Sequence, residues 1–222
     1  MAIRFSSTST SKHLAALLVA VSLMPASMLS QALPRLDRID EAARRPDFVT
    51  FRQQLRSAIA RRDVQAVLRV VDPQIKLGFD GDDGLDALKR KLESTDSEVW
   101  KELDEVLELG GTFQESDTFV APYVFSRWPE SFDSFEHVAV IGGNVRIRAR
   151  PALSAPVVAT VSYAILKLGP DGYSDEPWIG VRLPDGRAGF VDAKFARSPI
   201  DYRAAFKFED GRWRMVFFAA GD

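Results

Sequence analysis

The sequence contains no cysteine and only two histidines among its 222 residues. Without cysteine the chain has no disulfide bond, no thiolate nucleophile and no cysteine ligand for zinc. A serine triad would need one of the two histidines, and no Gly-x-Ser-x-Gly sequence marks a nucleophile elbow. The fold must therefore depend on its apolar core, and few side chains suited to nucleophilic catalysis are present.

Long apolar runs are also missing, apart from one near the start. Residues 14–24 are apolar, follow the basic Lys12 and end at Pro25. A bilayer span needs about 20 apolar residues, so this run is too short for a membrane anchor. Small residues at positions 30 and 32 predict a secretory signal over 1–32 with cleavage after Ala32. We expect a periplasmic or secreted protein that starts near Leu33, without a lipid anchor because no cysteine stands there.

The chain has little excess charge of either sign. It carries 29 Lys and Arg against 31 Asp and Glu. Removal of residues 1–32 takes away Arg4 and Lys12 and no acid, which leaves 27 basic against 31 acidic residues, a net charge of −4. This balance argues against nucleic acid as a partner, since such binding needs many contacts from Lys and Arg to phosphate. It also argues against adsorption to an anionic membrane.

Residues 33–135 are predicted to form a helix-rich α+β lobe. Phe48, Phe51, Leu55 and Ile59 recur at helical spacing after Pro46, which predicts the first helix. The apolar stripes of this lobe are interpreted as core. Three further helices are expected: a short one capped by Asp63, one over 84–93, and one that is capped by Ser97 and ended by Gly110-Gly111.

A short strand is expected between the second and third of these helices. Pro73 ends the second helix, because the residue before a proline avoids the helical region. Apolar residues then alternate at Ile75, Leu77 and Phe79. The strand is therefore placed over 75–79.

The loop at 80–86 concentrates carboxylates in a short segment. Asp80, Asp82, Asp83 and Asp86 are a weak candidate for a calcium site, because a hard cation prefers several oxygen ligands. The spacing departs from the EF-hand loop, which needs a glutamate where this chain has Lys91. The alternative is a Gly/Asp turn that stabilises the start of the next helix. We expect no cofactor.

The segment from 112 to 136 is rich in aromatic residues and is expected to fill a seam between two lobes. One or two strands are predicted near 119–126. Alternatively, these side chains line a binding cleft. The aromatic residues are Phe113, Phe119, Tyr123, Phe125, Trp128, Phe132 and Phe135.

Residues 136–197 carry short runs of β-branched and aliphatic residues separated by turn signals. Gly-Gly at 142–143 and Asp-Gly at 171–172 and 185–186 mark the turns. Many short strands with such turns predict a small all-β barrel.

The order of motifs in this segment resembles the bacterial SH3-like family. The chain has Asn-Val-Arg at 144–146, Pro at 151 and Ser at 154, Trp-Ile-Gly-Val at 178–181 and Asp-Gly-Arg-Ala-Gly-Phe-Val at 185–191. Phe190 replaces the usual Trp, and Ala164 stands near a usual glycine. With its signal, the whole layout resembles exported SH3-domain-containing proteins of Gram-negative bacteria. The resemblance implies binding to peptidoglycan or to an envelope protein.

The candidate ligand contacts are aromatic and basic side chains of this module. Aromatic faces stack on sugars and peptides, and arginines pair with carboxylates of wall peptides. Packing within the barrel is the alternative for Trp178 and Phe190, and a solvated face is the alternative for the arginines. The candidates are Tyr163, Tyr173, Trp178, Phe190 and Arg148, with Arg146, Arg150, Arg182 and Arg187 as further arginines.

The tail at 198–222 is predicted to be a β-hairpin around Asp210-Gly211. Trp213, Met215 and Phe217 are expected on one face, and Val216 with Phe218 on the other. A strand that is apolar on both faces needs more cover than a small barrel gives. The hairpin is therefore expected to pack on the 33–135 lobe.

The predicted fold class is α+β, with a helical N-terminal lobe, a C-terminal hairpin and an SH3-like barrel. The first functional hypothesis is a non-catalytic periplasmic binding or scaffold protein, not an enzyme. The alternative is a carboxylate-based cell-wall glycan hydrolase with an SH3-like targeting module. A concave cleft with two carboxylates would favour the alternative, and a filled core would favour the first hypothesis.

Cleavage after Ala32 can be tested by expressing the whole chain in a Gram-negative host and sequencing the N-terminus of the exported product. We expect Leu33 as the first residue. Ala32→Phe should block processing, because the peptidase needs a small residue there, whereas Gln31→Phe lies at the tolerant middle position and should not. An unprocessed chain that begins at Met1 would contradict the prediction.

Overall fold

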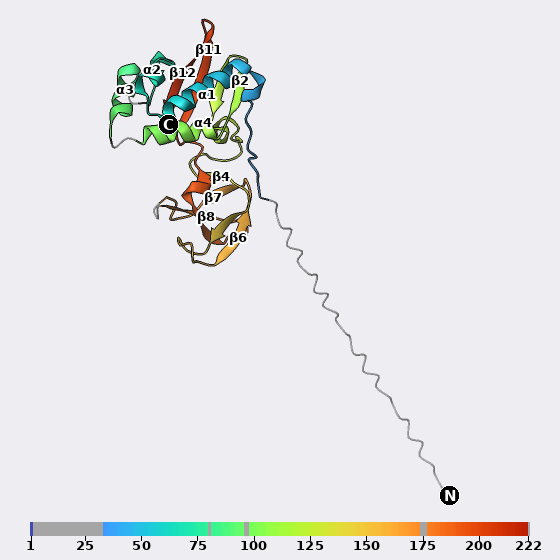
Figure 1. Cartoon of the computed structure of the whole chain (residues 1–222). Helices are drawn as coiled ribbons and strands as arrows, with labels where there is room; N and C mark the ends of the chain where they lie inside the picture. Colours follow the sequence, from blue (N-terminus) through green and yellow to red (C-terminus); the bar gives the residue numbers. More distant parts are fainter. Residues whose placement is uncertain (2–32, 80, 96–97, 174–176, 222) are drawn as a thin grey trace. The chain divides into compact units, whose positions relative to one another are not determined.

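The computed structural model describes residues 1, 33–79, 81–95, 98–173 and 177–221. The predicted secretory signal, except for Met1, and the predicted cap Ser97 lie outside the described residues. The part from Leu33 onwards is a mixed α+β structure with five α-helices and two β-sheets among its described residues (Figure 1). None of the described helices has the length and apolar character needed to cross a bilayer.

The first sheet has five strands in the order β1-β12-β11-β3-β2. The strands β1 and β12 run parallel, and the other neighbours run antiparallel. The last hairpin of the chain therefore lies inside the sheet, between strands from the N-terminal part. The bounds are β1 (Val71–Lys76), β2 (Thr112–Glu115), β3 (Thr118–Ala121), β11 (Arg203–Glu209) and β12 (Arg212–Ala219).

Helices cover one face of the first sheet (Figure 1). Their buried residues join the sheet in one core, which includes Leu55, Leu103, Phe206 and Met215. The short second helix begins as predicted, since the Asp63 side chain accepts a hydrogen bond from the Ala66 N–H at 2.9 Å. The helices are α1 (Pro46–Ala60), α2 (Val64–Leu68), α3 (Leu85–Glu93) and α4 (Val99–Glu108), with a 3₁₀ turn η1 (Ala42–Arg44) before α1.

The centre of this core is aromatic. Phe48 of α1 is fully buried and lies next to five other rings, with centroid distances from 4.3 Å to Phe119 up to 5.8 Å to Phe113. It approaches Trp213 edge-on at 4.8 Å. Aromatic pairs in such geometries add to the free energy gained by area burial alone.

A polar contact ties the start of α1 to β12. The Trp213 indole donates to Asp47 Oδ2 at 3.0 Å, and Arg45 makes a salt bridge to the same carboxylate at 2.6 Å. The Arg45 hydrogen bonds, with that from Trp213, lower the pKa of Asp47 to about 2. The first helix and the last strand are therefore held together by polar as well as apolar contacts.

The C-terminal hairpin turns at Asp210 and Gly211, which both have positive φ, at 51° and 77°. Two such residues define a type I′ turn, which favours Asp-Gly. The predicted facing of β12 is wrong for Phe217 and Phe218. Val216 is an extra residue between the pairs Phe206–Met215 and Ala205–Phe217, so Phe218 rather than Phe217 is buried in the core beyond Met215.

Two other predictions of local structure are wrong. The strand predicted over 75–79 lies over Val71–Lys76 because its pairing with β12 starts earlier, and Phe79 is 62% exposed. The strand predicted near 119–126 ends at Ala121, because a short helix α5 (Tyr123–Ser126) follows Pro122. In addition, β2 was not foreseen.

The second sheet has seven strands in the order β10-β4-β7-β8-β9-β5-β6. No ladder joins the edge strands β10 and β6 in the described part, so the sheet is not a closed barrel. The strand β10 has only two residues, and β5 meets β9 at the single pair Arg148–Phe190. The bounds are β4 (His137–Val140), β5 (Val145–Arg148), β6 (Val157–Val161), β7 (Ile165–Leu168), β8 (Trp178–Arg182), β9 (Ala188–Asp192) and β10 (Ala196–Arg197), with a 3₁₀ turn η2 (Ala193–Phe195) before β10.

A third, smaller apolar cluster joins segments from both sheets. It contains Leu109 after α4, Tyr123 of α5 and Ile165 of β7, with Trp128 and Phe132 packed against it. The prediction of an aromatic seam is confirmed for these three aromatic residues. It is wrong for Phe113 and Phe119, which belong to the core of the first sheet, and for the exposed Phe125 and Phe135.

Residues 33–41, named the strap here, cross between the two sheets. The Ile165 N–H donates to the Pro34 carbonyl and the Leu36 N–H to the Tyr163 carbonyl, both at 2.8 Å. Further along, the Glu41 N–H donates to the Gly111 carbonyl at 2.9 Å, directly before β2. The strap is thus bonded to both sheets within a few residues.

Phe48→Ala should lower the free energy of unfolding by about 3–5 kcal/mol, because it removes a buried ring from a packed cluster. Chemical denaturation of the chain from Leu33 measures this. Phe79→Ala is the matched control: its ring is 62% exposed, and we expect a change within about 0.5 kcal/mol. Equal losses for the two variants would contradict the described core.

Candidate functional site

The sequence-predicted Phe190 and Arg148 lie side by side on the second sheet. Arg148 of β5 is the direct partner of Phe190 of β9, and Phe190 in turn faces Gly180 of β8. On its other side Arg148 is the partner of Val157 of β6, which is 46% exposed. Directly opposite residues of antiparallel strands project to the same face, so these side chains form one row. The opposite face carries the core of the second sheet, including Ile147 and Val191.

Arginines surround this row. Arg146 and Arg150 are exposed, and neither forms an ion pair with any residue that the structure describes. Arg148 donates from Nη1 to the Ala155 carbonyl at 2.8 Å, which holds the guanidinium in place. No Asp or Glu occurs from residue 144 to residue 161. The surface of β5 and β6 is therefore basic, and we call Arg146, Arg148, Arg150, Val157 and Phe190 the β5 surface.

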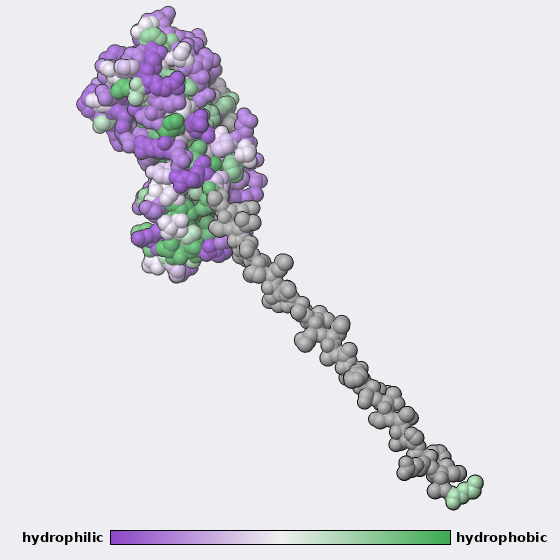
Figure 2. Space-filling view, turned by 90° about the vertical axis from the view of Figure 1, so that its right-hand side faces the viewer, coloured by the Kyte–Doolittle hydropathy of each residue, from purple (hydrophilic) through white to green (hydrophobic). Residues whose placement is uncertain are grey.

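Figure 2 shows hydrophobic surface gathered over the part formed by the second sheet, whereas the surface over the helices is mostly hydrophilic. Leu153, which precedes β6, is 70% exposed. Exposed apolar groups next to unpaired cations are typical of surfaces that bind a partner.

Neither Trp178 nor Tyr173 is a direct strand partner of a residue of the β5 surface. Trp178 starts β8 and is only 8% exposed, which agrees with a packing role rather than a ligand contact. Tyr173 is 45% exposed, but its hydroxyl is desolvated: burial raises the pKa of Tyr173, and a hydrogen bond with Ser198 opposes the rise. The ring is therefore accessible while the hydroxyl is already engaged.

Tyr163 belongs to the strap region. It has φ of 50° in the turn between β6 and β7, and its carbonyl accepts the hydrogen bond from Leu36. The Arg35 guanidinium lies 5.9 Å from the ring centroid. The structure thus brings together Phe190 and Arg148 but places Tyr163 in a structural contact.

The acidic loop is engaged in contacts that suit a turn. Asp80 lies outside the described residues. Asp83 accepts from the Leu77 N–H at 2.8 Å and pairs with Lys76 at 2.6 Å, and Asp82 pairs with Arg90 at 2.6 Å. The hydrogen bond from Lys76 lowers the pKa of Asp83. Among the described residues no group of His, Asp and Glu, these and Asp86 included, is arranged to hold a metal ion.

A buried charge cluster between the sheets was missed by the sequence analysis. Arg197 of β10 is 5% exposed and donates to Glu102 at 3.2 Å and to Glu105 at 3.1 Å, both on α4. It also donates to the Tyr202 carbonyl at 2.9 Å and lies 3.7 Å from Asp201. No sequence signal identified this cluster, because Glu102 and Arg197 are 95 positions apart.

Burial dominates the electrostatics of Glu102. Desolvation raises the pKa of Glu102; the charge of Arg197 lowers it, and the carboxylates of Asp201 and Glu105 raise it again. The net direction is upward. Glu102 and Glu105 are therefore held by Arg197, which links α4 to β10.

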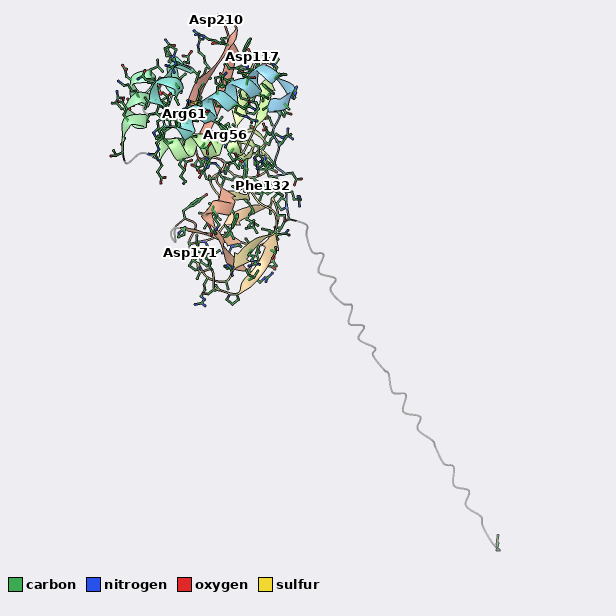
Figure 3. The ribbon with its side chains drawn as sticks, in the orientation of Figure 1. Arg56, Arg61, Asp117, Phe132, Asp171 and Asp210 are labelled. Carbon is green, nitrogen blue, oxygen red and sulfur yellow. The ribbon has the colours of Figure 1, made fainter. Side chains whose placement is uncertain are left out.

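One groove of about 230 Å³ lies on the second sheet, where the strap meets β7 and β8. Phe132, labelled in Figure 3 on the loop that leads into β4, forms part of its wall. The lining has no Asp or Glu; its polar side chains are His137, Lys167 and Arg182. It was not foreseen from the sequence either.

No protein-family model matches the chain, and no curated protein gives a significant match to it.

Arg197→Met should lower the free energy of unfolding by about 3–5 kcal/mol at neutral pH, because Glu102 stays buried without its partner. The raised pKa means that the folded state favours protonated Glu102, so stability falls as pH rises through that pKa. The loss in Arg197→Met should therefore shrink as pH is lowered. Denaturation at several pH values measures both effects.

Arg146→Met provides the control, since Arg146 is exposed and has no ion pair in the described part of the chain. We expect a change within about 0.5 kcal/mol. A loss in Arg197→Met that stayed constant from neutral to acidic pH would contradict the role given to Glu102.

Proposed function

We propose that the protein is a non-catalytic, exported binding protein of the bacterial envelope that holds peptidoglycan through the β5 surface of its second sheet. The proposal includes the assignment of residues 136–197 to the SH3-like class, which the order of motifs supports. It also includes cleavage of the signal after Ala32 and a periplasmic location. An envelope protein is the alternative partner.

The observation that carries the proposal is the row Phe190–Arg148–Val157 with Arg146 and Arg150 beside it. The guanidinium groups have no carboxylate partner among the described residues, and the surface has no acid over residues 144–161. Arginine binds carboxylates in a bidentate manner, and peptidoglycan peptides carry free carboxylates. The ring of Phe190 adds an apolar face for stacking.

Three observations argue against the hydrolase alternative. The helix-covered face of the first sheet is filled by buried residues such as Phe48, Phe119 and Phe206, so it leaves no cleft for a glycan strand. The carboxylates Glu102 and Glu105 are engaged by Arg197. Glycoside hydrolysis needs two carboxylates that face one open site, and the groove on the second sheet has none in its lining.

Pelleting with isolated peptidoglycan sacculi tests the proposal. The chain from Leu33 to Asp222 should be retained in the pellet, and retention should fall as salt is raised, since salt screens exposed charges. Arg146→Ser combined with Arg150→Ser should release most of the protein to the supernatant. Both side chains are exposed, so folding should be unaffected.

Arg69→Ser combined with Arg212→Ser is the matched control. It removes the same charge from two exposed arginines that lie outside the second sheet and form no ion pair among the described residues. This control should pellet like the unchanged chain. If the unchanged chain stayed in the supernatant, peptidoglycan would not be the partner; if both double variants lost retention equally, the β5 surface would not be the site.

A further inference from the structure

Three basic side chains are aligned across three neighbouring strands of the second sheet. His137 of β4 is the direct partner of Lys167 of β7, and Lys167 is the direct partner of Arg182 of β8. Direct partners in antiparallel strands have Cβ atoms about 4.5–5.5 Å apart and project to the same face. Like charges in this position destabilise a sheet. Stability alone therefore does not explain why Lys167 and Arg182 are neighbours.

The same three residues line the groove of about 230 Å³. This volume is below the roughly 300–1,000 Å³ of sites for drug-sized ligands. The groove has room for one side chain with its backbone groups rather than for a saccharide. Apart from the three basic residues the lining is apolar and includes Leu33, Pro34, Phe132, Ile165, Leu183 and Pro184.

The charges of the groove favour an occupant with one negative charge. Lys167 is already paired with Glu136 at 2.9 Å. Arg182 donates from Nη1 to the Gly186 carbonyl at 3.2 Å and has no carboxylate partner in the described part of the chain. One cation thus remains without a counter-charge. A carboxylate supplies one negative charge, whereas a phosphate group carries about 1.5–2.

His137 presents an acceptor next to these cations. Its Nδ1 lies 3.0 Å from the Asp133 carbonyl oxygen. A carbonyl only accepts, so Nδ1 carries a proton, and in the neutral form of the ring Nε2 accepts an N–H. The Phe132 ring meets the imidazole edge-on at 5.3 Å and limits its rotation.

We propose that this groove binds the C-terminal residue of a peptide whose last side chain is apolar. The terminal carboxylate lies on Arg182 and Lys167, its backbone N–H donates to His137 Nε2, and its side chain packs against Ile165, Leu183 and Pro184. The site is separate from the β5 surface and does not require that peptidoglycan be the partner of that surface.

Titration of the isotope-labelled chain, Leu33 to Asp222, with N-acetyl-Ala-Leu tests the proposal, with amide chemical shifts as the readout. The shifts should move at residues 165–167 and 182–184. N-acetyl-Ala-leucinamide lacks the carboxylate and should bind at least about tenfold more weakly, because a charge-assisted hydrogen bond is lost. Inorganic phosphate should also bind at least about tenfold more weakly, because it makes no apolar contact.

Arg182→Gln should weaken binding of N-acetyl-Ala-Leu by at least about tenfold. Arg182 is exposed, so an unchanged unfolding transition will show that the fold is intact. Arg69→Gln removes the same charge from an exposed arginine outside the second sheet and should leave the affinity unchanged. The amide binding as well as the acid, phosphate binding as well as the peptide, or equal losses in both variants would each overturn the proposal.

Because pelleting with sacculi depends on Arg146 and Arg150, and peptide binding depends on Arg182, either result can fail alone. Loss of wall retention with intact peptide binding would leave the groove in place. Intact retention with no shifts at the groove would overturn the proposed peptide site and leave the proposed role of the β5 surface unaffected.

Discussion

The filled core on the helix-covered face of the first sheet is the constraint on which the rest of the structure depends. Phe48 is buried among five rings, one contributed by α1 and four by the strands β2, β3, β11 and β12. A sheet with helices on one face either encloses a cavity there or closes it with side chains, and here aromatic side chains close it. The described residues thus leave no space for a ligand between these helices and the first sheet, and the binding surfaces are proposed on the second sheet.

The second sheet is attached to this support at three places that differ in physical character. The strap provides backbone hydrogen bonds to both sheets, the cluster around Tyr123 provides apolar packing, and Arg197 provides buried ion pairs to α4. Burial raises the pKa of Tyr123 to about 12, so its phenol stays neutral within the seam. A buried ion pair is weak evidence for stability by itself, yet removal of one partner is costly, so Arg197 fixes one arrangement. The β5 surface remains outside these attachments, whereas the groove is lined in part by Pro34 of the strap and by Ile165 and Phe132 of the apolar cluster.

Local structure could be predicted from the sequence where it depends on residues within a single short segment. The first helix begins at Pro46 and Asp63 caps the second, because both depend on neighbours within a few residues. The Asp210-Gly211 turn is likewise local. The position of β1 depends on its pairing with β12, about 140 positions further along, and the bulge at Val216 depends on the register of β12 against β11; no local pattern records either. The same holds for the site: alternation placed Arg146 and Arg148 on one face, but the row from His137 to Arg182 exists only through register. Arg197 appeared as an ordinary charged residue because burial is a property of the assembled chain.

The account places all ligand contacts on the second sheet and none on the first. The most direct measurement is a map of the amide chemical shifts of the chain from Leu33 to Asp222 as soluble muropeptides are added. The account predicts that the changes concentrate on β5, β6 and β9, around Arg148 and Phe190. Changes confined to the helices and strands of the first sheet, or no changes at concentrations at which sacculi retain the protein, would contradict it.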